Sequence, residues 1–192
     1  MLSTDSKTGS LLVDRYMKYY RLEIDGLVRE LPIVSLTPKI KIASVNLLGD
    51  IEMVEVIAKK IVNRIKKYDF DSLVGPEVKV VPLLHEISRI MGKPSYVVCR
   101  KQIYGYMVAP LKTRLKPGLV LDGSDAKRIR NKKVIVIDDV VSSGRTLRVV
   151  EELMASADAE VVVNLAVFKQ GDIQEGLPEK FILIEKLPIF TP

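Results

Sequence analysis

The chain has 192 residues, of which 47% are hydrophobic and 28% are charged, so it is long enough to bury the core of one compact domain. This composition excludes intrinsic disorder and collagen-like repeats. No apolar run approaches the ~18 residues of a membrane span, and residues 1–10 lack a hydrophobic signal core, so we expect a cytoplasmic protein with no membrane partner. One cysteine, Cys99, and one histidine, His85, exclude a disulfide framework and a Cys/His zinc site.

Basic residues outnumber acidic ones, 30 to 24, which gives a formal net charge of +6. This balance suits an anionic partner such as nucleic acid or a phosphorylated small molecule, although solubility alone also explains it. Aromatic residues make up only 6% of the chain, and no RNP, zinc-finger or basic-zipper pattern accompanies the charge. We therefore predict a small phosphate-rich ligand and no nucleic-acid partner.

Residues 1–45 form a predicted N-terminal extension, and residues 46–192 form the core of what we expect to be a single compact domain. In the extension we expect a short helix followed by irregular or strand-like chain. The core begins with a predicted amphipathic helix over residues 50–67, where apolar residues recur at three- and four-residue steps behind Gly49 and a capping Asp50.

Short apolar runs and amphipathic segments alternate along the rest of the core. Helices are predicted from Pro82 to a stop at Gly92 and over residues 147–154. Strands are predicted over residues 71–75, 96–99, 134–137, 161–167 and 181–184. This alternation is typical of an α/β protein with a doubly wound, mostly parallel sheet. Residues 101–133 lack periodicity, which indicates a long lid or binding loop.

The most informative segment runs from Val134 to Leu147, where a predicted buried strand ends in Asp138 and Asp139. A turn of small and polar residues then leads into a helix, and its N–H groups, hydroxyls and helix N-terminus suit one phosphate group. The residues of this turn are Ser142, Ser143, Gly144, Arg145 and Thr146. The two carboxylates lie where ligands bind in open α/β sheets and can accept hydrogen bonds from sugar hydroxyls. A ribose 5-phosphate fits both halves of the segment.

The alternative is a strand, turn and helix with an ordinary cap, but two carboxylates at the end of an apolar strand are costly without a ligand or cation. A Walker-type loop is excluded because the Gly-Lys-Thr ending is absent. The segment instead resembles the signature of the phosphoribosyltransferase family, in which an apolar run and two acids precede a small-Thr/Ser-Gly-x-Thr turn. Asp138, Asp139, Ser143, Gly144 and Thr146 match this signature, and the resemblance covers about residues 45–185.

The resemblance implies a type I phosphoribosyltransferase fold with a small N-terminal hood and a flexible loop. It implies that Asp138 and Asp139 are catalytic residues at the ribose hydroxyls of phosphoribosyl pyrophosphate, and that residues 142–146 surround its 5-phosphate. Two further segments resemble the purine branch of the family, especially adenine and xanthine phosphoribosyltransferases. The resemblance places pyrophosphate at Glu77, Val78 and Lys79 before a helix, and at the catalytic pair Arg100 and Lys101 after a strand.

Some residues depart from the family pattern or allow a second interpretation. Lys79 and Val80 replace the usual arginine and glycine, which alters how the backbone approaches pyrophosphate, and Arg145 stands where a second glycine is common. Arg100 and Lys101 are alternatively a solvated strand end. In the family such a pair often reaches the neighbouring subunit's site, which implies a homodimer.

The resemblance also implies a moving loop and a metal cofactor. Residues 101–133 resemble the flexible catalytic loop, with Tyr104 and Tyr106 as candidate contacts. The implied cofactor is Mg²⁺, carried by the substrate with no direct protein ligand and with Asp138 or Asp139 in contact through water.

The residues expected at the base give mixed signals. Asn46 resembles the base-contacting Asn of xanthine-type enzymes, or is a turn residue. Phe168 and Lys169 stand where 6-oxopurine enzymes place an aromatic ring over the base and a lysine on its exocyclic oxygen. Ser142 instead matches the small residue of adenine enzymes, where 6-oxopurine enzymes have an aspartate. We therefore favour adenine, with hypoxanthine, guanine or xanthine as the alternative.

The predicted function is purine salvage, in which adenine and phosphoribosyl pyrophosphate give AMP and pyrophosphate. A second hypothesis is a regulator that senses phosphoribosyl pyrophosphate and binds DNA. The forty residues before the shared region are too few for a winged helix and show no helix-turn-helix pattern, which disfavours it. His85 and Cys99 are expected to be a helix-surface residue and a core residue, and one histidine supplies no convincing Ser-His-Asp arrangement.

Overall fold

The computed structural model describes residues 18–171 and 176–191, and the chain divides into two compact units. The first unit comprises residues 1–45 and 188–192, and the second comprises residues 46–187. The last five residues therefore belong with the N-terminal unit and not with the core, which differs from the expected domain boundaries. The reason is that strand β11 (Ile189–Phe190) pairs with β3 (Ile40–Ala43) of the first unit.

The first unit is an antiparallel sheet in the order β1-β2-β3-β11. Strands β1 (Tyr19–Ile24) and β2 (Leu27–Thr37) are joined by Asp25 and Gly26, which both have positive φ angles, as a tight two-residue hairpin requires. Leu22, Ile24 and Leu31 are buried in this unit. The strand-like part of the expectation is confirmed from Tyr19 onward, and the part that falls on residues 1–17 lies outside the described residues.

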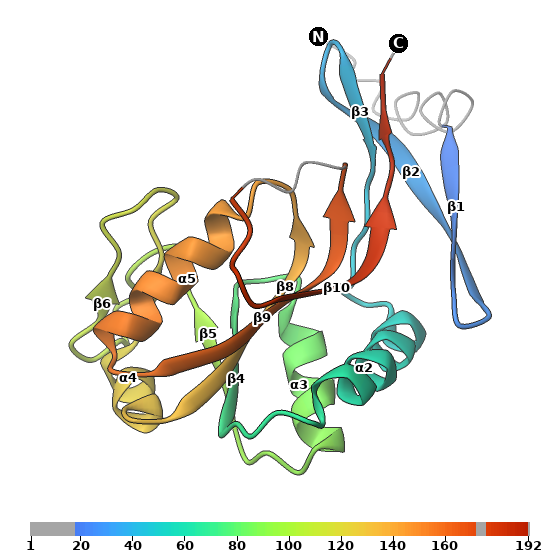
Figure 1. The fold of residues 1–192 in the computed structure, drawn as a ribbon. Coiled ribbons are helices and arrows are strands. Elements are labelled where there is room, and N and C mark those ends of the chain that lie inside the picture. Colours follow the sequence, from blue (N-terminus) through green and yellow to red (C-terminus); the bar gives the residue numbers. More distant parts are fainter. Residues whose placement is uncertain (1–17, 172–175, 192) are drawn as a thin grey trace, which may run out of the picture. The chain divides into compact units, whose positions relative to one another are not determined.

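The second unit is built on a parallel sheet in the order β10-β9-β8-β4-β5 (Figure 1). Its strands are β4 (Ser72–Pro76), β5 (Tyr96–Cys99), β8 (Lys133–Val141), β9 (Glu160–Gln170) and β10 (Phe181–Leu187). All five predicted strands are present, but β8 runs past its expected end at Ile137. Its ladder with β9 continues through the pairs Asp138–Ala166 and Val141–Lys169, so the two carboxylates lie within the strand.

Four helices accompany the sheet in the described part of this unit. They are α2 (Ile51–Ile65), α3 (Val81–Ile90), α4 (Gly123–Ile129) and α5 (Arg145–Ser156). The Asp50 side chain accepts a hydrogen bond from the Met53 N–H, which confirms the predicted cap of α2. The expected loop over residues 101–133 is wrong in part, since it contains α4 and the short antiparallel strands β6 (Leu111–Lys112) and β7 (Val120–Leu121).

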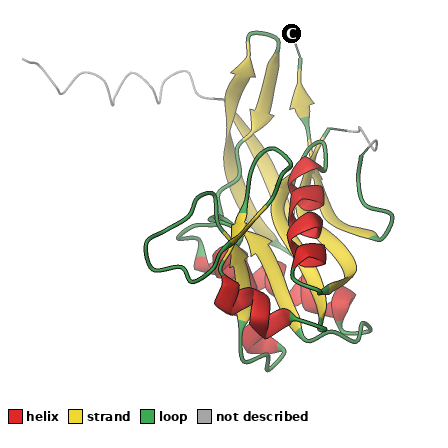
Figure 2. Ribbon diagram, turned by 90° about the vertical axis from the view of Figure 1, so that its left-hand side faces the viewer, coloured by secondary structure: helices red, strands yellow, loops and turns green. Residues whose placement is uncertain are grey.

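Helices cover both faces of the parallel sheet, as Figures 1 and 2 show. Val74 of β4 packs into an apolar cluster with residues of α4 and α5. The next residue, Gly75, faces the other way, and a Cβ placed on it would lie 3.1 Å from a Leu84 methyl group of α3. The same Cβ would lie 2.6 Å from the Ile137 carbonyl oxygen, so only glycine fits here. This close approach brings the ends of β4 and β8 together.

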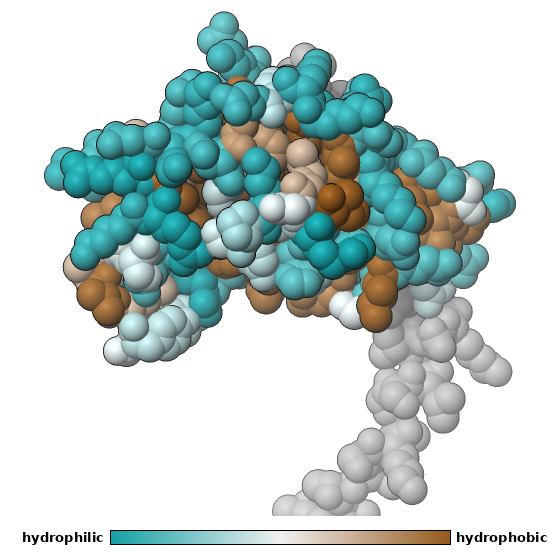
Figure 3. Space-filling view, turned by 90° about the horizontal axis from the view of Figure 1, so that it is seen from below, coloured by the Kyte–Doolittle hydropathy of each residue, from teal (hydrophilic) through white to brown (hydrophobic). Residues whose placement is uncertain are grey.

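Figure 3 shows a mainly hydrophilic face with hydrophobic patches between the polar side chains. No helix within the described ranges is long and apolar enough to cross a membrane.

Candidate active site

The order of the parallel strands defines a crevice at one edge of the sheet. Along the chain, β4 is followed by β5 on one side of it, whereas β8 lies on its other side. Loops that leave β4 and β8 therefore diverge at the carboxyl ends of these strands, where open α/β sheets bind ligands. The predicted phosphate and pyrophosphate segments both begin at this edge, after β8, β4 and β5.

The turn after β8 leaves a helix N-terminus available to an anion. Gly144 is the N-cap of α5, and among the described residues no side chain caps the helix. Ser142, Ser143 and Arg145 are exposed and Thr146 is half-buried, so polar side chains that reach the surface stand at the start of the helix. This arrangement is suited to one phosphate group.

Gly144 is required by the conformation of this turn. Its φ angle is +69°, and a Cβ on it would lie 2.4 Å from the carbonyl oxygen of Gly176. Gly176 also has a positive φ, and its own Cβ would approach the Ser143 carbonyl oxygen at 3.0 Å. The motif in the sequence identified Gly144, but no local signal indicated its contact with Gly176.

Asp138 and Asp139 differ sharply in their environments. Asp138 is only 4% exposed, whereas Asp139 is half-buried. Burial raises the pKa of Asp138 well above its ordinary value, and the neighbouring Asp139 carboxylate raises this pKa further. The Asp139 N–H donates to Asp138 Oδ1 at 2.9 Å, which fixes the orientation of the buried carboxyl. The pair can offer one half-buried and one buried carboxyl to a polar ligand.

Glu77 holds the Arg100 and Lys101 segment in place. Its carboxylate forms an ion pair with the Arg100 guanidinium and accepts the Lys101 N–H at 2.7 Å. Burial by itself would raise the pKa of Glu77, but the hydrogen bond from Lys101 and the charge and hydrogen bond of Arg100 together lower it. Since a carboxylate repels an anion, these contacts suit Glu77 to orient Arg100, and its predicted contact with pyrophosphate stays a prediction.

The remaining residues of the loop after β4 have two different environments. Val78 and Lys79 are exposed, and Val78 is joined to Glu77 by a cis peptide bond. Val80 is 1% exposed, and its methyl group occupies the space that a Gly75 side chain would need. The valine that replaces the family's usual glycine at position 80 therefore packs its side chain in the core.

The two tyrosines of residues 101–133 stack beside Arg100. The Arg100 guanidinium lies 4.5 Å from the ring centre of Tyr104, and the rings of Tyr104 and Tyr106 are nearly parallel with centres 5.6 Å apart. Tyr106 is 65% exposed. These contacts associate the loop with the predicted pyrophosphate residues.

The three residues expected at the base are not equally available. The Phe168 side chain has no exposed surface, so the expectation that it covers a base is not supported. Lys169 is 3% exposed, and its ammonium donates to the Gly171 carbonyl oxygen at 2.8 Å. Asn46 is exposed, and its side-chain oxygen accepts the Leu48 N–H at 3.4 Å, as in a turn.

A metal ion would find few protein ligands at this site. Within residues 18–171 and 176–191, no three His, Cys, Asp or Glu side chains are grouped to hold a metal. Asp138 and Asp139 together supply two carboxyl groups. This donor set fits a Mg²⁺ ion whose direct ligands are substrate oxygens and waters, with the carboxyl groups in contact through those waters.

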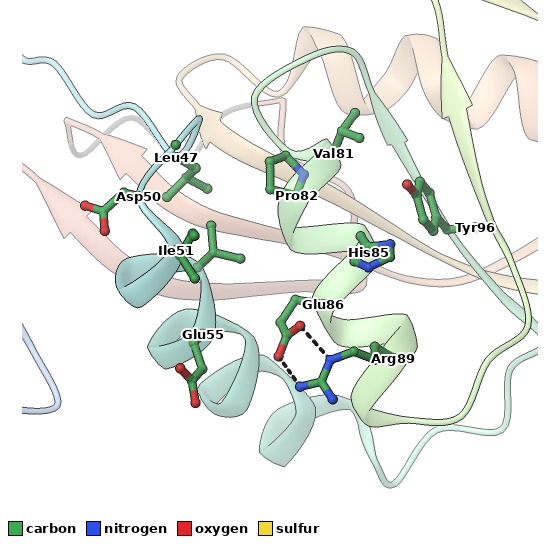
Figure 4. A pocket seen from close by; sticks show the side chains of 12 residues that line it. Leu47, Asp50, Ile51, Glu55, Val81, Pro82, His85, Glu86, Arg89 and Tyr96 are labelled. Atoms are coloured by element: carbon green, nitrogen blue, oxygen red, sulfur yellow. Dashed lines mark hydrogen bonds and ion pairs between the residues drawn. The ribbon is translucent and has the colours of Figure 1, made fainter.

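A cavity lies between α2 and α3, and none of the predicted site residues lines it. It has a volume of about 600 Å³ and is shown in Figure 4. Its lining is mainly apolar and includes Leu47, Val54 and Pro82, with the ion pair of Glu86 and Arg89 at 2.7 Å on one side. Ile51, which is 82% exposed, stands at this cavity.

The parallel sheet and the turn of residues 142–146 at the start of α5 define an α/β protein with a predicted phosphate site, and comparison with solved structures narrows this class of fold. Adenine phosphoribosyltransferase from Thermoanaerobacter pseudethanolicus superposes with a TM-score of 0.63 at 15% identity, covering 91% of this chain and 98% of that chain. The Trypanosoma brucei enzyme, solved with AMP, pyrophosphate and ribose-5-phosphate, gives a TM-score of 0.62 at 18% identity, covering 97% and 82%. The expected type I phosphoribosyltransferase fold is thereby confirmed.

Sequence comparison then identifies the family. The model of the phosphoribosyl transferase domain matches residues 48–185, so the chain belongs to this family. HGPRTase-like protein 3 of Haloterrigena turkmenica is 33% identical over 131 residues, which cover 66% of this chain and 68% of the relative. Orotate phosphoribosyltransferase of Thermotoga maritima is 27% identical over 140 residues, which cover 72% and 67%.

Proposed function

We propose that the protein is a purine phosphoribosyltransferase that joins a base to phosphoribosyl pyrophosphate and releases pyrophosphate. The observation that carries this proposal is the N-terminus of α5, which no side chain of the described residues caps and which follows Asp138 and Asp139 after a short turn at the carboxyl edge of the sheet. The turn would bind the 5-phosphate through N–H groups and hydroxyls, and the carboxyl pair would accept hydrogen bonds from ribose hydroxyls. Membership of the family supports this assignment.

The proposed chemistry depends on charge stabilisation and not on a nucleophile. As the bond from C1 of the ribose to pyrophosphate breaks, negative charge grows on the leaving group and positive charge grows on the sugar. Arg100, oriented by Glu77, and Lys101 would stabilise the pyrophosphate, and Asp138 and Asp139 would hold the ribose. Holding both reactants together supplies much of the remaining acceleration.

We expect Mg²⁺ to enter with the substrate. When bound, it would neutralise charge on the pyrophosphate oxygens. Asp138 and Asp139 are the carboxyl groups that would hold it through water.

The base that we favour is adenine. The Lys169 ammonium is a donor, so it would suit the oxygen of a 6-oxopurine and not the 6-amino group of adenine, which is another donor. In the structure this ammonium already donates to the Gly171 carbonyl oxygen, which is consistent with a base that does not need it. The alternative is hypoxanthine, guanine or xanthine, and it draws support from a relative named hypoxanthine/guanine phosphoribosyltransferase in Methanothermococcus okinawensis, 29% identical over 133 residues.

A parallel assay would decide the function and the base. Purified protein, Mg²⁺ and phosphoribosyl pyrophosphate are offered adenine, hypoxanthine, guanine, xanthine, uracil and orotate, and formation of each monophosphate is measured. We expect AMP as the main product and a Lys169→Ala variant within about tenfold of the parent, or ~1.4 kcal/mol in the barrier. Product from hypoxanthine or guanine alone, with a loss of a hundredfold or more in the variant, would reject adenine. No monophosphate from any base would reject the proposed function.

We also propose that the protein acts as a homodimer. The exposed Ile51 beside the apolar cavity between α2 and α3 supports this, because burying its apolar side chain under a second copy would stabilise the dimer.

A further inference from the structure

The segment from Arg100 to Leu121 is rich in cations and has no acidic residue of its own. It carries Arg100, Lys101, Lys112, Arg114 and Lys116. Its second half folds back as the β6–β7 hairpin, and β7 pairs with the end of β5 through Arg100. The N–H of Arg100 donates to the Val120 carbonyl oxygen, and the Val120 N–H donates to the Arg100 carbonyl oxygen, both at 2.7 Å. The backbone position of Arg100 therefore depends on the hairpin.

The turn of this hairpin is tied together internally. Thr113 is 6% exposed, and its hydroxyl oxygen accepts the Leu119 N–H at 3.0 Å and donates to the Leu115 carbonyl oxygen at 3.3 Å. The Thr113 N–H also donates to the Leu119 carbonyl oxygen at 3.0 Å. A contact made at the turn is therefore transmitted to β7.

Glu152 of α5 provides such a contact with both of its carboxylate oxygens. Oε1 accepts the Arg114 N–H at 3.1 Å, and Oε2 accepts the Leu115 N–H at 3.3 Å. A carboxylate that binds two adjacent N–H groups fixes the direction of the chain as well as its distance. Glu152 lies about two helical turns after Arg145. The turn of residues 142–146, which is the predicted phosphate site, is at the Arg145 end of the same helix.

We propose that Glu152 is a positioning residue that sets the separation between the two phosphate-binding ends of the site. Helix α5 begins at the turn that would hold the 5-phosphate, and Glu152 fastens to the same helix the hairpin that pairs with Arg100. This inference rests on the proposed function, because it requires a ligand that reaches both ends at once. Phosphoribosyl pyrophosphate is such a ligand, whereas ribose 5-phosphate and pyrophosphate each occupy one end only.

The binding test compares these three ligands in graded variants. Glu152→Gln keeps one acceptor oxygen and Glu152→Ala keeps none, while Glu160→Gln removes an exposed carboxylate elsewhere on the second unit and is the control. By titration calorimetry we expect the dissociation constant for phosphoribosyl pyrophosphate to rise about tenfold in Glu152→Ala, with Glu152→Gln intermediate and Glu160→Gln unchanged. The constants for ribose 5-phosphate and pyrophosphate should stay within about twofold. An equal loss for all three ligands, or no loss for phosphoribosyl pyrophosphate, would overturn the proposal.

Hydrogen exchange tests the anchor itself without any ligand. We expect faster exchange over residues 113–119 in both Glu152 variants, with the exchange of α2 unchanged. Unchanged exchange in this turn overturns the role of Glu152 whatever the ligand data show. If the parent protein fails to bind phosphoribosyl pyrophosphate, the proposed function is wrong, and with it the role of Glu152 in binding, even if faster exchange shows that Glu152 anchors the turn.

Discussion

At the scale of single residues, the candidate site contains a carboxyl group, that of Asp138, which lowers the stability of the fold and which the proposed function would use. Asp138 is a nearly buried carboxyl beside a second carboxyl, and both burial and the charge of Asp139 raise its pKa. A carboxyl group in this place destabilises the folded protein, and a shifted pKa of this kind is typical of functional sites.

We expect Asp138→Asn to lower turnover at least tenfold while raising the melting temperature. An asparagine oxygen can still accept the Asp139 N–H, so the local geometry is kept while the ionisable group is removed. A gain of about 1 kcal/mol would raise the melting temperature by roughly 2–4 °C in a protein of this size.

The stability gain of Asp138→Asn should depend on pH in a defined direction. Because the folded pKa is raised, the parent and the variant should differ little below the ordinary aspartate value of 3.8. The advantage of the variant should grow as pH rises through the folded pKa and then stay constant. Calorimetric melts across pH check this, and a variant that melts lower at neutral pH would show that Asp138 has a structural role.

Glu77 should show the opposite dependence on pH. Its folded pKa is lowered, so ionised Glu77 stabilises the protein above its ordinary value of 4.5, and this contribution is lost as pH falls through the folded pKa. Glu77→Gln should therefore be less stable than the parent at neutral pH, with a difference that shrinks in acid. Its KM for phosphoribosyl pyrophosphate should rise because Arg100 loses its ion pair. A constant difference across pH, measured by denaturant unfolding, would contradict this account.

At the scale of helices and strands, the periodic elements were predictable and the short ones were not. The helix from Ile51 to Ile65 and the buried strands follow from the spacing of their apolar residues. The two-residue strands β6 and β7 have no period to detect, and α4 is only seven residues long. The end of β8 was misplaced because pairing with β9 carries Asp138 and Asp139 within the ladder, which polarity alone does not reveal.

The site was predictable where it depends on contiguous sequence. The turn of residues 142–146 is one local motif, so its position at the start of α5 followed from the sequence. The ion pair of Glu77 with Arg100 and the contact of Gly144 with Gly176 join distant segments, and no single sequence records such contacts. The burial of Phe168 could not be predicted, because a buried aromatic residue and a base-stacking one look identical in sequence.

The phosphate turn itself gives a prediction with a matched control. Gly144→Ala places a side chain on a residue with φ +69° and within 2.4 Å of the Gly176 carbonyl oxygen, whereas Gly92→Ala meets φ +65° with nothing within 4 Å. Both variants should lose about 1 kcal/mol for the backbone conformation, and Gly144→Ala should lose more because the turn must shift. Only Gly144→Ala should bind phosphoribosyl pyrophosphate more weakly in calorimetry. Equal losses of stability in the two variants would mean that the contact with Gly176 yields at little cost.

At the scale of the whole molecule, the proposed homodimer predicts that association of two copies depends on Ile51. Ile51 is 82% exposed and stands at the apolar cavity between α2 and α3, so a lysine there places a charge on the surface that a second copy would cover. In sedimentation equilibrium we expect the parent at twice the chain mass of 21.5 kDa and Ile51→Lys at the chain mass. Leu36→Lys, which replaces an apolar side chain that is 60% exposed in the first unit, is the control and should remain a dimer. Since Ile51 makes little contact within its own chain, Ile51→Lys should fold normally, and circular dichroism checks this. A monomeric parent would reject the homodimer, and a dimeric Ile51→Lys would place the interface on another face.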